Sequence, residues 1–282
     1  MKIGIVVCTN SGADYHKFDY PVEIIHSYLH LDDDLYEDYV DITAEEFYEK
    51  IAANPNIDVK TSQPPVGKIL ETYEELKNSG HSHILVITIS KMLSGIYQTA
   101  KLASEMLEGV KVSVIDSKTV SYGELYLVLE AIKYIQAGKE FDEIVELLEN
   151  KIKDINILVY VDTLKYLVKN GRLSVAGGAL GSLLKIKPIL RMDQHTGKVI
   201  PFQRIRTSRK ALLKIIEIFE EETKDRDVDI FIAYTNNLEL AKQLASKLLE
   251  IKPNSKIELT PLTPVVGAHA GPGTLGIGYV FI

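Results

Sequence analysis

The chain has 282 residues, and its 32 Lys and Arg against 39 Asp and Glu give a formal net charge of −7 at pH 7. This balance argues against a sequence-independent nucleic-acid binder, which needs a concentrated basic face. No stretch approaches the roughly 20 apolar residues of a membrane-spanning helix, and the first residues lack the long apolar run of a signal peptide. We therefore expect a soluble cytoplasmic protein. The single cysteine, Cys8, cannot form an internal disulfide and has no cysteine partner for a metal site.

The first half of the chain alternates predicted strands with predicted helices. Short apolar runs predict strands at 3–7, 84–89 and 110–115, and amphipathic runs predict helices over 66–76 and 96–107 and from residue 121. The strands end in hydroxyl-rich turns at 8–14, 90–95 and 116–121. A parallel sheet with one ligand-binding crevice at its carboxyl edge is predicted from this order.

The remaining stretches of this half carry weaker signals. A possible strand spans 22–28, and the acid run at 32–34 is interpreted as a solvated loop. Thr43 with Glu46, and Ser121 with Glu124, have the spacing of capping boxes, in which side-chain oxygens accept from the first amides of a helix. Both pairs therefore predict helix starts.

Hydroxyl side chains in the crevice loops are the first candidates for ligand contact. Ser94 precedes a predicted helix start, where unpaired N–H groups and the positive end of the helix dipole favour an anion. Thr61 and Ser62 precede the helix at 66–76, where they either cap that helix or face a ligand. We expect a small acidic ligand.

A domain boundary is predicted near residue 154, because the second half reads as a different fold. A short helix over 162–171, with an aspartate cap and a terminal glycine, comes before Arg172. A small-residue stretch at 176–181 then leads to a strand over 185–191, a hairpin loop at 193–197 and a strand over 198–206. Helices over 208–223 and 238–249 alternate with strands over 228–234 and 256–262. We expect an α+β domain with a largely antiparallel sheet and helices on one face.

The glycine-rich tail contains Gly271, Gly273 and Gly276 at the spacing of a dinucleotide fingerprint. That fingerprint needs a following helix and an acidic residue about 20 positions on, and only six residues follow Gly276. The glycines instead predict a tight loop that carries His269 ahead of a final strand. A structural role and a functional role for His269 both stay open.

Six motifs occur in order along the chain: Thr61-Ser62-Gln63-Pro64, Leu93-Ser94-Gly95-Ile96-Tyr97-Gln98-Thr99-Ala100, Val114-Ile115-Asp116-Ser117-Lys118, Tyr166-Leu167-Val168-Lys169-Asn170-Gly171-Arg172, Ile186-Lys187-Pro188-Ile189-Leu190 and Gly267-Ala268-His269-Ala270-Gly271-Pro272-Gly273. Together they resemble the DegV family of bacterial fatty-acid-binding proteins. The first loop departs from the family pattern Thr-Asp-Ser-Ser-Ala-Asp, because Asn10 and Gly12 replace an acid and a hydroxyl there.

The resemblance implies a Rossmann-like α/β domain at 1–154 and an α+β domain at 155–282, which contributes a lipid tunnel and the His269 loop. One long-chain fatty acid would lie between them without any cofactor. Thr61, Ser62, Ser94, Gly95 and His269 would bind its carboxylate.

The resemblance also implies a partner. A separate fatty acid kinase subunit would convert the bound acid to an acyl phosphate, with Arg172 and Arg206 near the opening to contact the kinase or the phosphate. An ordinary helix-end or strand-end role stays open for both arginines. The chain itself would not be an enzyme, because it lacks a phosphate loop and a carboxylate pair suited to Mg²⁺. Transient membrane contact stays open.

Two other functions remain as alternatives. A serine hydrolase or acyltransferase would use Ser94 as nucleophile, His269 as base and Asp116 to orient the histidine, although Ser94 lacks the G-x-S-x-G elbow. A phosphate-ester binder would use only the hydroxyls near helix starts. Apolar segments at 125–135 and 179–184 would line a tunnel under the first interpretation, and core packing accounts for them equally well.

Overall fold

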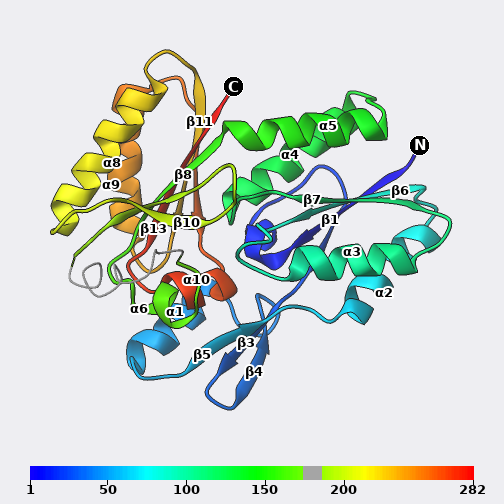
Figure 1. Ribbon diagram of the computed structural model, residues 1–282, viewed down its shortest axis with the longest axis horizontal. Helices are drawn as coiled ribbons and strands as arrows, with labels where there is room; N and C mark the ends of the chain where they lie inside the picture. Colours follow the sequence, from blue (N-terminus) through cyan, green and yellow to red (C-terminus); the bar gives the residue numbers. More distant parts are fainter. Residues whose placement is uncertain (174–185) are drawn as a thin grey trace.

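The computed structural model describes residues 1–173 and 186–282. Two sheets lie side by side, with helices between them and on their outer faces (Figure 1). The small-residue stretch at 176–181, the possible tunnel segment at 179–184 and the start of the strand expected at 185 fall outside the described residues. The mixed α/β architecture predicted from the sequence is confirmed.

The first sheet is parallel throughout, in the order β2–β1–β6–β7. Alternate side chains of β1 and β6 point to opposite faces, as the pleat requires. One face packs on α2 and α3, and the other on α4 and α5. The elements are β1 (Ile3–Cys8), β2 (Val22–Ile25), β6 (His83–Thr88), β7 (Lys111–Asp116), α2 (Val66–Asn78), α3 (Ile96–Met106), α4 (Tyr122–Gln136) and α5 (Phe141–Lys151). Short 3₁₀ turns follow β1 at Thr9–Ser11 and Ala13–Tyr15, and another follows α5 at Ile152–Asp154.

The second sheet has the order β10–β9–β8–β13–β11–β12, and only its β11–β12 pair is parallel. Helices α8 and α9 cover its outer face (Figure 1, yellow and orange). The largely antiparallel sheet predicted for the second half is confirmed. The elements are β8 (Ile155–Tyr160), β9 (Ile189–Met192), β10 (Val199–Gln203), β11 (Val228–Tyr234), β12 (Ile257–Pro261), β13 (Leu275–Phe281), α6 (Lys165–Lys169), α8 (Ser208–Thr223) and α9 (Leu238–Ile251).

Helix α4 packs between the two sheets. Its first seven residues, 122–128, are all buried, because the helix is apolar around most of its circumference rather than along one stripe. One core cluster joins α4 to Ile5 and Leu85 of the first sheet and to Ile157 and Phe231 of the second. The division into domains at 1–154 and 155–282 stays a prediction.

A third, antiparallel sheet in the order β4–β3–β5 was not predicted. It consists of β3 (Tyr28–Leu31), β4 (Asp34–Glu37) and β5 (Val59–Ser62), and it packs on α1 (Ala44–Ala53) and α10 (Pro264–Ala270). The strand expected over 22–28 is divided between β2 and β3. The acid run at 32–34 is exposed at the β3–β4 turn, as interpreted.

Candidate ligand-binding site

A cavity lies between the carboxyl edge of the first sheet, the end of β5, helix α10 and the inner face of the second sheet. It encloses about 1020 Å³ of space that protein atoms do not fill, including its open mouth. Aliphatic side chains from both halves of the chain form most of its wall. Its polar lining residues are Asn10, Ser27, Thr61, Ser62, Gln63, Ser94, Ser121, Arg172, His269 and Thr274.

Thr61 and His269 meet at this cavity although 208 positions separate them in the chain. The Thr61 Oγ1 atom lies 2.8 Å from His269 Nε2, and His269 Nδ1 is buried without a hydrogen-bond partner in residues 1–173 and 186–282. Burial lowers the pKa of His269 to about 4, and the positive charge of Arg172 acts in the same direction. The imidazole is therefore neutral at pH 7.

The tautomer of His269 follows from these contacts. A buried N–H without an acceptor is rarer in proteins than a buried acceptor without a donor. The tautomer that fits places the proton on Nε2, which donates to Thr61 Oγ1. The Thr61 hydroxyl hydrogen is then available to an acceptor in the cavity.

Ser94 and Gly95 lie where α3 begins. Ser94 Oγ accepts from the Ile96 backbone N–H at 3.3 Å, while the N-cap residue Gly95 supplies no side-chain cap. An ideal Cβ at Gly95 would lie 2.4 Å from Gln63 Oε1, so glycine allows the end of β5 to approach α3. Ser94 lines the cavity together with Thr61 and Ser62 of β5, whereas Gly95 is not among the lining residues.

The two candidate arginines lie in different places. Arg172 follows α6 and lines the cavity, and it donates from Nε to the Leu93 carbonyl at 3.2 Å and from Nη1 to the Asn170 carbonyl at 2.5 Å. Arg206 is exposed between β10 and α8 and is not among the cavity-lining residues. Only Arg172 is close enough to influence His269.

Sequence reasoning missed three buried polar residues of the cavity wall. Asn10 Oδ1, Ser27 Oγ and Ser121 Oγ have no hydrogen-bond partner among the described residues. They follow β1, β2 and β7, so the parallel register places them along one edge of the first sheet. The hydroxyl-rich loops at 8–14 and 116–121 were the available signal for Asn10 and Ser121. Ser27 lies in the stretch at 22–28 that the sequence left ambiguous.

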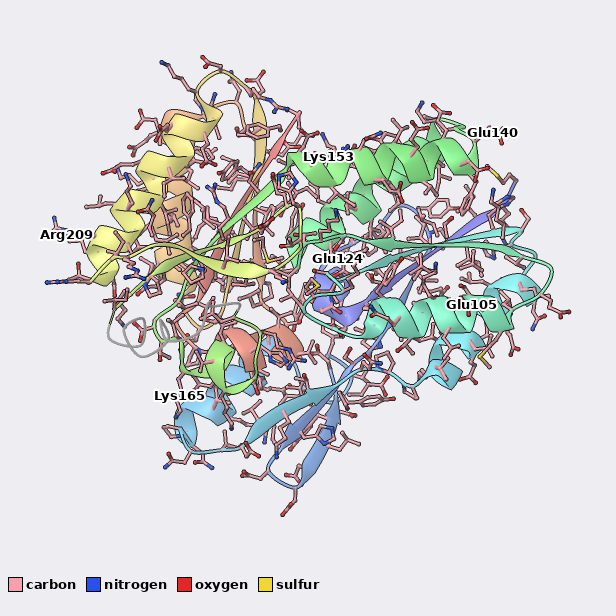
Figure 2. All side chains as sticks on the ribbon, viewed as in Figure 1. Glu105, Glu124, Glu140, Lys153, Lys165 and Arg209 are labelled. Carbon is pink, nitrogen blue, oxygen red and sulfur yellow. The ribbon has the colours of Figure 1, made fainter. Side chains whose placement is uncertain are left out.

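Glu124 lies in the interior of the molecule, in contrast to the other labelled charged residues in Figure 2. Its Oε2 accepts from Asn10 Nδ2 at 2.5 Å, while Oε1 has no hydrogen-bond partner in the part of the chain that the structure describes. Burial raises the pKa of Glu124 well above the ordinary value, and Glu124 in turn contributes to the raised pKa of the Cys8 thiol. Burial therefore favours the protonated form of both groups, and Glu124 holds the Asn10 amide at the cavity wall.

Several local predictions were wrong. The Ser121–Glu124 capping box does not form, because Ser121 has a positive φ of 56° and Glu124 reaches Asn10 instead. His269 lies in helix α10 rather than in a tight loop, since Pro264 begins a helix there.

Other local interpretations also change. Thr61 and Ser62 belong to strand β5 and do not cap α2, whose N-cap is Pro65. Leu164, not Asp162, is the N-cap residue of α6. The helical segment at 125–135 does not line this cavity.

Ser94, His269 and Asp116 are not arranged as the catalytic triad that the hydrolase alternative needs. Asp116 accepts from the backbone N–H groups of Lys91 and Lys118, both at 3.1 Å. Within residues 1–173 and 186–282, no contact joins Asp116 to His269, and the nearest partner of His269 is Thr61. The histidine therefore lacks the carboxylate that would orient it as a base.

The described part of the chain contains neither a cluster of metal ligands nor a helix that could span a membrane. No group of three or more His, Cys, Asp or Glu side chains there is arranged to hold a metal ion. None of the helices in that part has the length and apolar character needed to cross a membrane.

Comparison with known proteins defines the class to which this fold and cavity belong. A family model described as an uncharacterised protein, DegV family, matches residues 2–281. A DegV domain-containing protein of Staphylococcus aureus is 35% identical over 284 residues, which cover 99% of this chain and 98% of that protein. One from Clostridium acetobutylicum is 32% identical and covers 98% of both chains. This chain belongs to the DegV family, as its motifs implied.

Solved structures agree with this assignment. A protein of Streptococcus agalactiae, described as a fatty acid binding DegV family protein, is 28% identical with a TM-score of 0.90 over 99% of both chains. DegV of Bacillus subtilis, described as a fatty acid binding protein, is 29% identical with a TM-score of 0.89 over the whole of both chains.

Proposed function

We propose that this protein binds one long-chain fatty acid, with the carboxylate at Thr61, Ser94 and His269 and the acyl chain in the apolar cavity. The observation that carries the proposal is the neutral Thr61–His269 pair at the opening of an aliphatic cavity. The descriptions of the Streptococcus agalactiae and Bacillus subtilis relatives as fatty acid binding proteins support it.

The chemistry of the site suits a carboxylate. An ionised group in an apolar site must receive hydrogen bonds, because an unpaired charge there costs several kcal/mol. The Thr61 and Ser94 hydroxyls can donate, Ser62 also lines the cavity, and Gly95 follows Ser94 in the chain and lies against Gln63. Each buried methylene of the acyl chain adds about 0.8 kcal/mol.

The carboxylate would also stay reactive in this site. Hydroxyl donors leave carboxylate oxygens free to attack a phosphoryl group, whereas a bidentate arginine would occupy both of them. Ser62 and Gln63 are exposed, so the headgroup end is open to a partner. We propose that a separate ATP-using fatty acid kinase subunit phosphorylates the bound acid to an acyl phosphate. Arg172 and Arg206 then contact the kinase or the phosphate, and the phosphorylation takes place in the cytoplasm. The chain is then a substrate carrier and not itself an enzyme.

The first test identifies the ligand. Protein purified from cells is denatured and extracted, and the extract is analysed by mass spectrometry; we expect one fatty acid per chain. Ser94→Ala and Thr61→Val should retain less fatty acid with an unchanged fold. Ser104→Ala on the α3 surface and Thr223→Val in α8 are matched controls and should retain the wild-type amount. Extracts that hold only polar metabolites would contradict the proposal, and a covalent ester adduct on Ser94 would favour a hydrolase.

The second test addresses the partner. Fatty acid-loaded protein is mixed with ATP and a fatty acid kinase subunit, and acyl phosphate is trapped with hydroxylamine. Arg206→Ala should lower the rate of trapping while leaving the amount of bound fatty acid unchanged, because Arg206 is not a cavity-lining residue. Arg172→Ala should lower the rate of trapping per bound fatty acid. Wild-type rates in both variants would remove the arginines from the proposal. Trapping that needs no added kinase would contradict the carrier role.

A further inference from the structure

The strand register of the second sheet determines which residues line the inner end of the cavity. Residues two positions apart on a strand share a face and are about 7 Å apart along it. Two rows of residues cross β11, β13 and β8 on the face towards α4. The first row is Ala233, Gly276 and Val159. The second row, two residues further along each strand, is Phe231, Gly278 and Ile157. The first row lies nearer to α10 and the headgroup residues, and the second row lies deeper.

The first of these rows leaves space and the second fills it. Ala233 and Gly276 line the cavity with almost no side chain. In the deeper row the Phe231 ring lies across Gly278, where an ideal Cβ would meet the ring Cζ atom at 1.9 Å. The absence of a side chain at Gly278 therefore allows the ring to cover the row.

Tyr122 completes this closure from the side of α4. Its ring centroid is 5.1 Å from that of Phe231, and the planes are inclined by 36°. Exposure to solvent is only 1% for Phe231 and 7% for Tyr122, so both rings lie in the interior. We call Phe231 and Tyr122 the aromatic partition.

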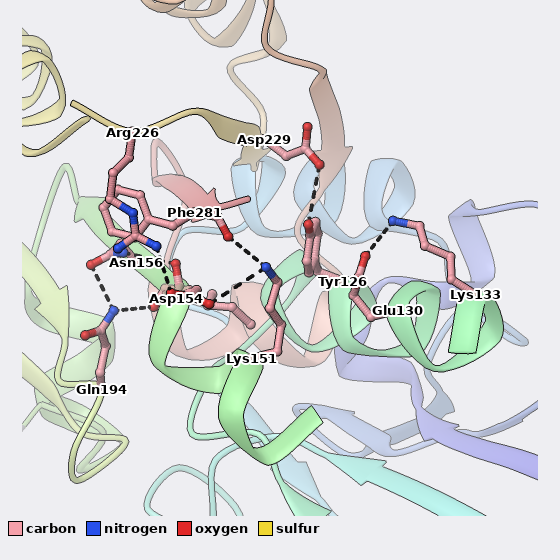
Figure 3. Close-up of polar contacts among 11 residues, drawn as sticks. Tyr126, Glu130, Lys133, Lys151, Asp154, Asn156, Gln194, Arg226, Asp229 and Phe281 are labelled. Carbon is pink, nitrogen blue, oxygen red and sulfur yellow. Dashed lines mark hydrogen bonds and ion pairs between the residues drawn. The ribbon is translucent and has the colours of Figure 1, made fainter. Parts of the chain in front are cut away.

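A second cavity begins on the other side of the aromatic partition. It encloses about 870 Å³ including its open mouth, and Phe231 lines both cavities. Its wall is mixed: aromatic and aliphatic side chains lie beside the charged residues Asp229 of β11, Glu258 of β12 and Lys256, which precedes β12. Figure 3 shows Tyr126 of α4 pointing to Asp229 of β11, where the hydroxyl lies 3.4 Å from Oδ2. Asp229 lies one row beyond Phe231 on the same face of β11, so a charged group follows the ring on the side of the second cavity.

We propose that the aromatic partition ends the acyl cavity and sets the longest chain that the protein accommodates. This inference rests on the proposed function. A methyl end that reaches Phe231 has filled the apolar space, and a longer chain must either displace the ring or leave methylenes at the mouth. A smaller side chain at either position opens the acyl cavity towards the second one and admits additional methylenes.

The experiment measures affinity as a function of chain length. Delipidated full-length protein is titrated with saturated fatty acids that increase by two carbons, using displacement of a fluorescent fatty acid. For wild type we expect affinity to rise about four-fold per added methylene up to a limiting length and then to stop rising. Phe231→Leu and Tyr122→Leu should each move that limit to longer chains. Phe219→Leu is the matched control, because Phe219 is fully buried in a comparable aromatic pair with Tyr279 at 5.5 Å and lines neither cavity.

The outcomes separate the two proposals. If wild type binds no fatty acid, the proposed function fails and the inference with it. If wild type binds with a limiting length that both partition variants leave unchanged, only the inference is overturned. The inference is also overturned if Phe219→Leu shifts the limit as much as they do, since general loosening of the core would then be the cause. If Phe231→Leu does not fold, Tyr122→Leu decides the question.

Discussion

His269 provides a direct test of the electrostatics of the headgroup site in the absence of ligand. The folded protein holds the pKa of His269 at about 4, against an ordinary value of 6.5, because the ring is buried and Arg172 is near. As pH falls below 6.5, the unfolded chain binds a proton that the folded chain does not. The free energy of unfolding must therefore fall between pH 6.5 and pH 4, and this part of the stability is fully present above pH 6.5.

The two pKa values determine the magnitude of this loss. Linkage gives a loss from this one group of about 2 kcal/mol at pH 5 and about 3 kcal/mol at pH 4. Replacing His269 by glutamine removes the titration and keeps a side-chain N–H that can donate to Thr61. On acidification, the free energy of unfolding of the variant should therefore fall less than that of wild type, and the difference should equal this amount.

Urea unfolding of delipidated protein, followed by circular dichroism at a series of pH values from 8 to 4.5, measures the difference. His195→Gln, at an exposed position in the 193–197 turn, controls for the loss of a histidine as such. If wild type and His269→Gln lose stability in parallel between pH 7 and pH 5, the imidazole is not the neutral buried group described above. The assignment of the Thr61 hydroxyl as a free donor would then be refuted.

Three further predictions concern the core and the helix starts. Glu124→Gln should abolish a decline in stability with rising pH above about 4.3, because the raised pKa keeps the buried acid protonated while the unfolded chain ionises; urea midpoints from pH 5 to pH 8 measure it. Gly278→Ala should lower the melting temperature by several degrees through its clash with a buried ring, whereas Gly67→Ala, with open space at its Cβ, should raise it slightly or leave it unchanged. Thr43→Ala should cost about 1 kcal/mol by loss of a formed capping box, and Ser121→Ala less than half as much in the same urea titration. The burial of Glu124 would be contradicted if Glu124→Gln still lost stability with rising pH. The clash at Gly278 would be contradicted by equal melting temperatures for the two glycine variants, and the Thr43 capping box by equal losses of stability in the two cap variants.

The sequence by itself determined the elements whose signal is local. The 3.6-residue apolar period placed α8 at Ser208–Thr223, and a continuous apolar run placed β11 at Val228–Tyr234. The alternation of strands and helices predicted the parallel sheet, and the order of the motifs predicted the family. Thr43 and Glu46 formed their capping box because both partners lie within one helical turn and face solvent, where no other partner competes.

Only the tertiary structure decided which polar groups meet in the interior. Ser121 and Glu124 have the same spacing as Thr43 and Glu46, yet Glu124 is buried against Asn10, and no local pattern encodes that partner. In the same way, Phe231 and Ala233 are equivalent positions in an apolar run, and only the pairing of β11 with β13 sets one over Gly278 and the other beside Gly276. Capping and periodicity act within a turn or two of chain, whereas burial and register depend on neighbours that the fold brings from distant parts of the chain.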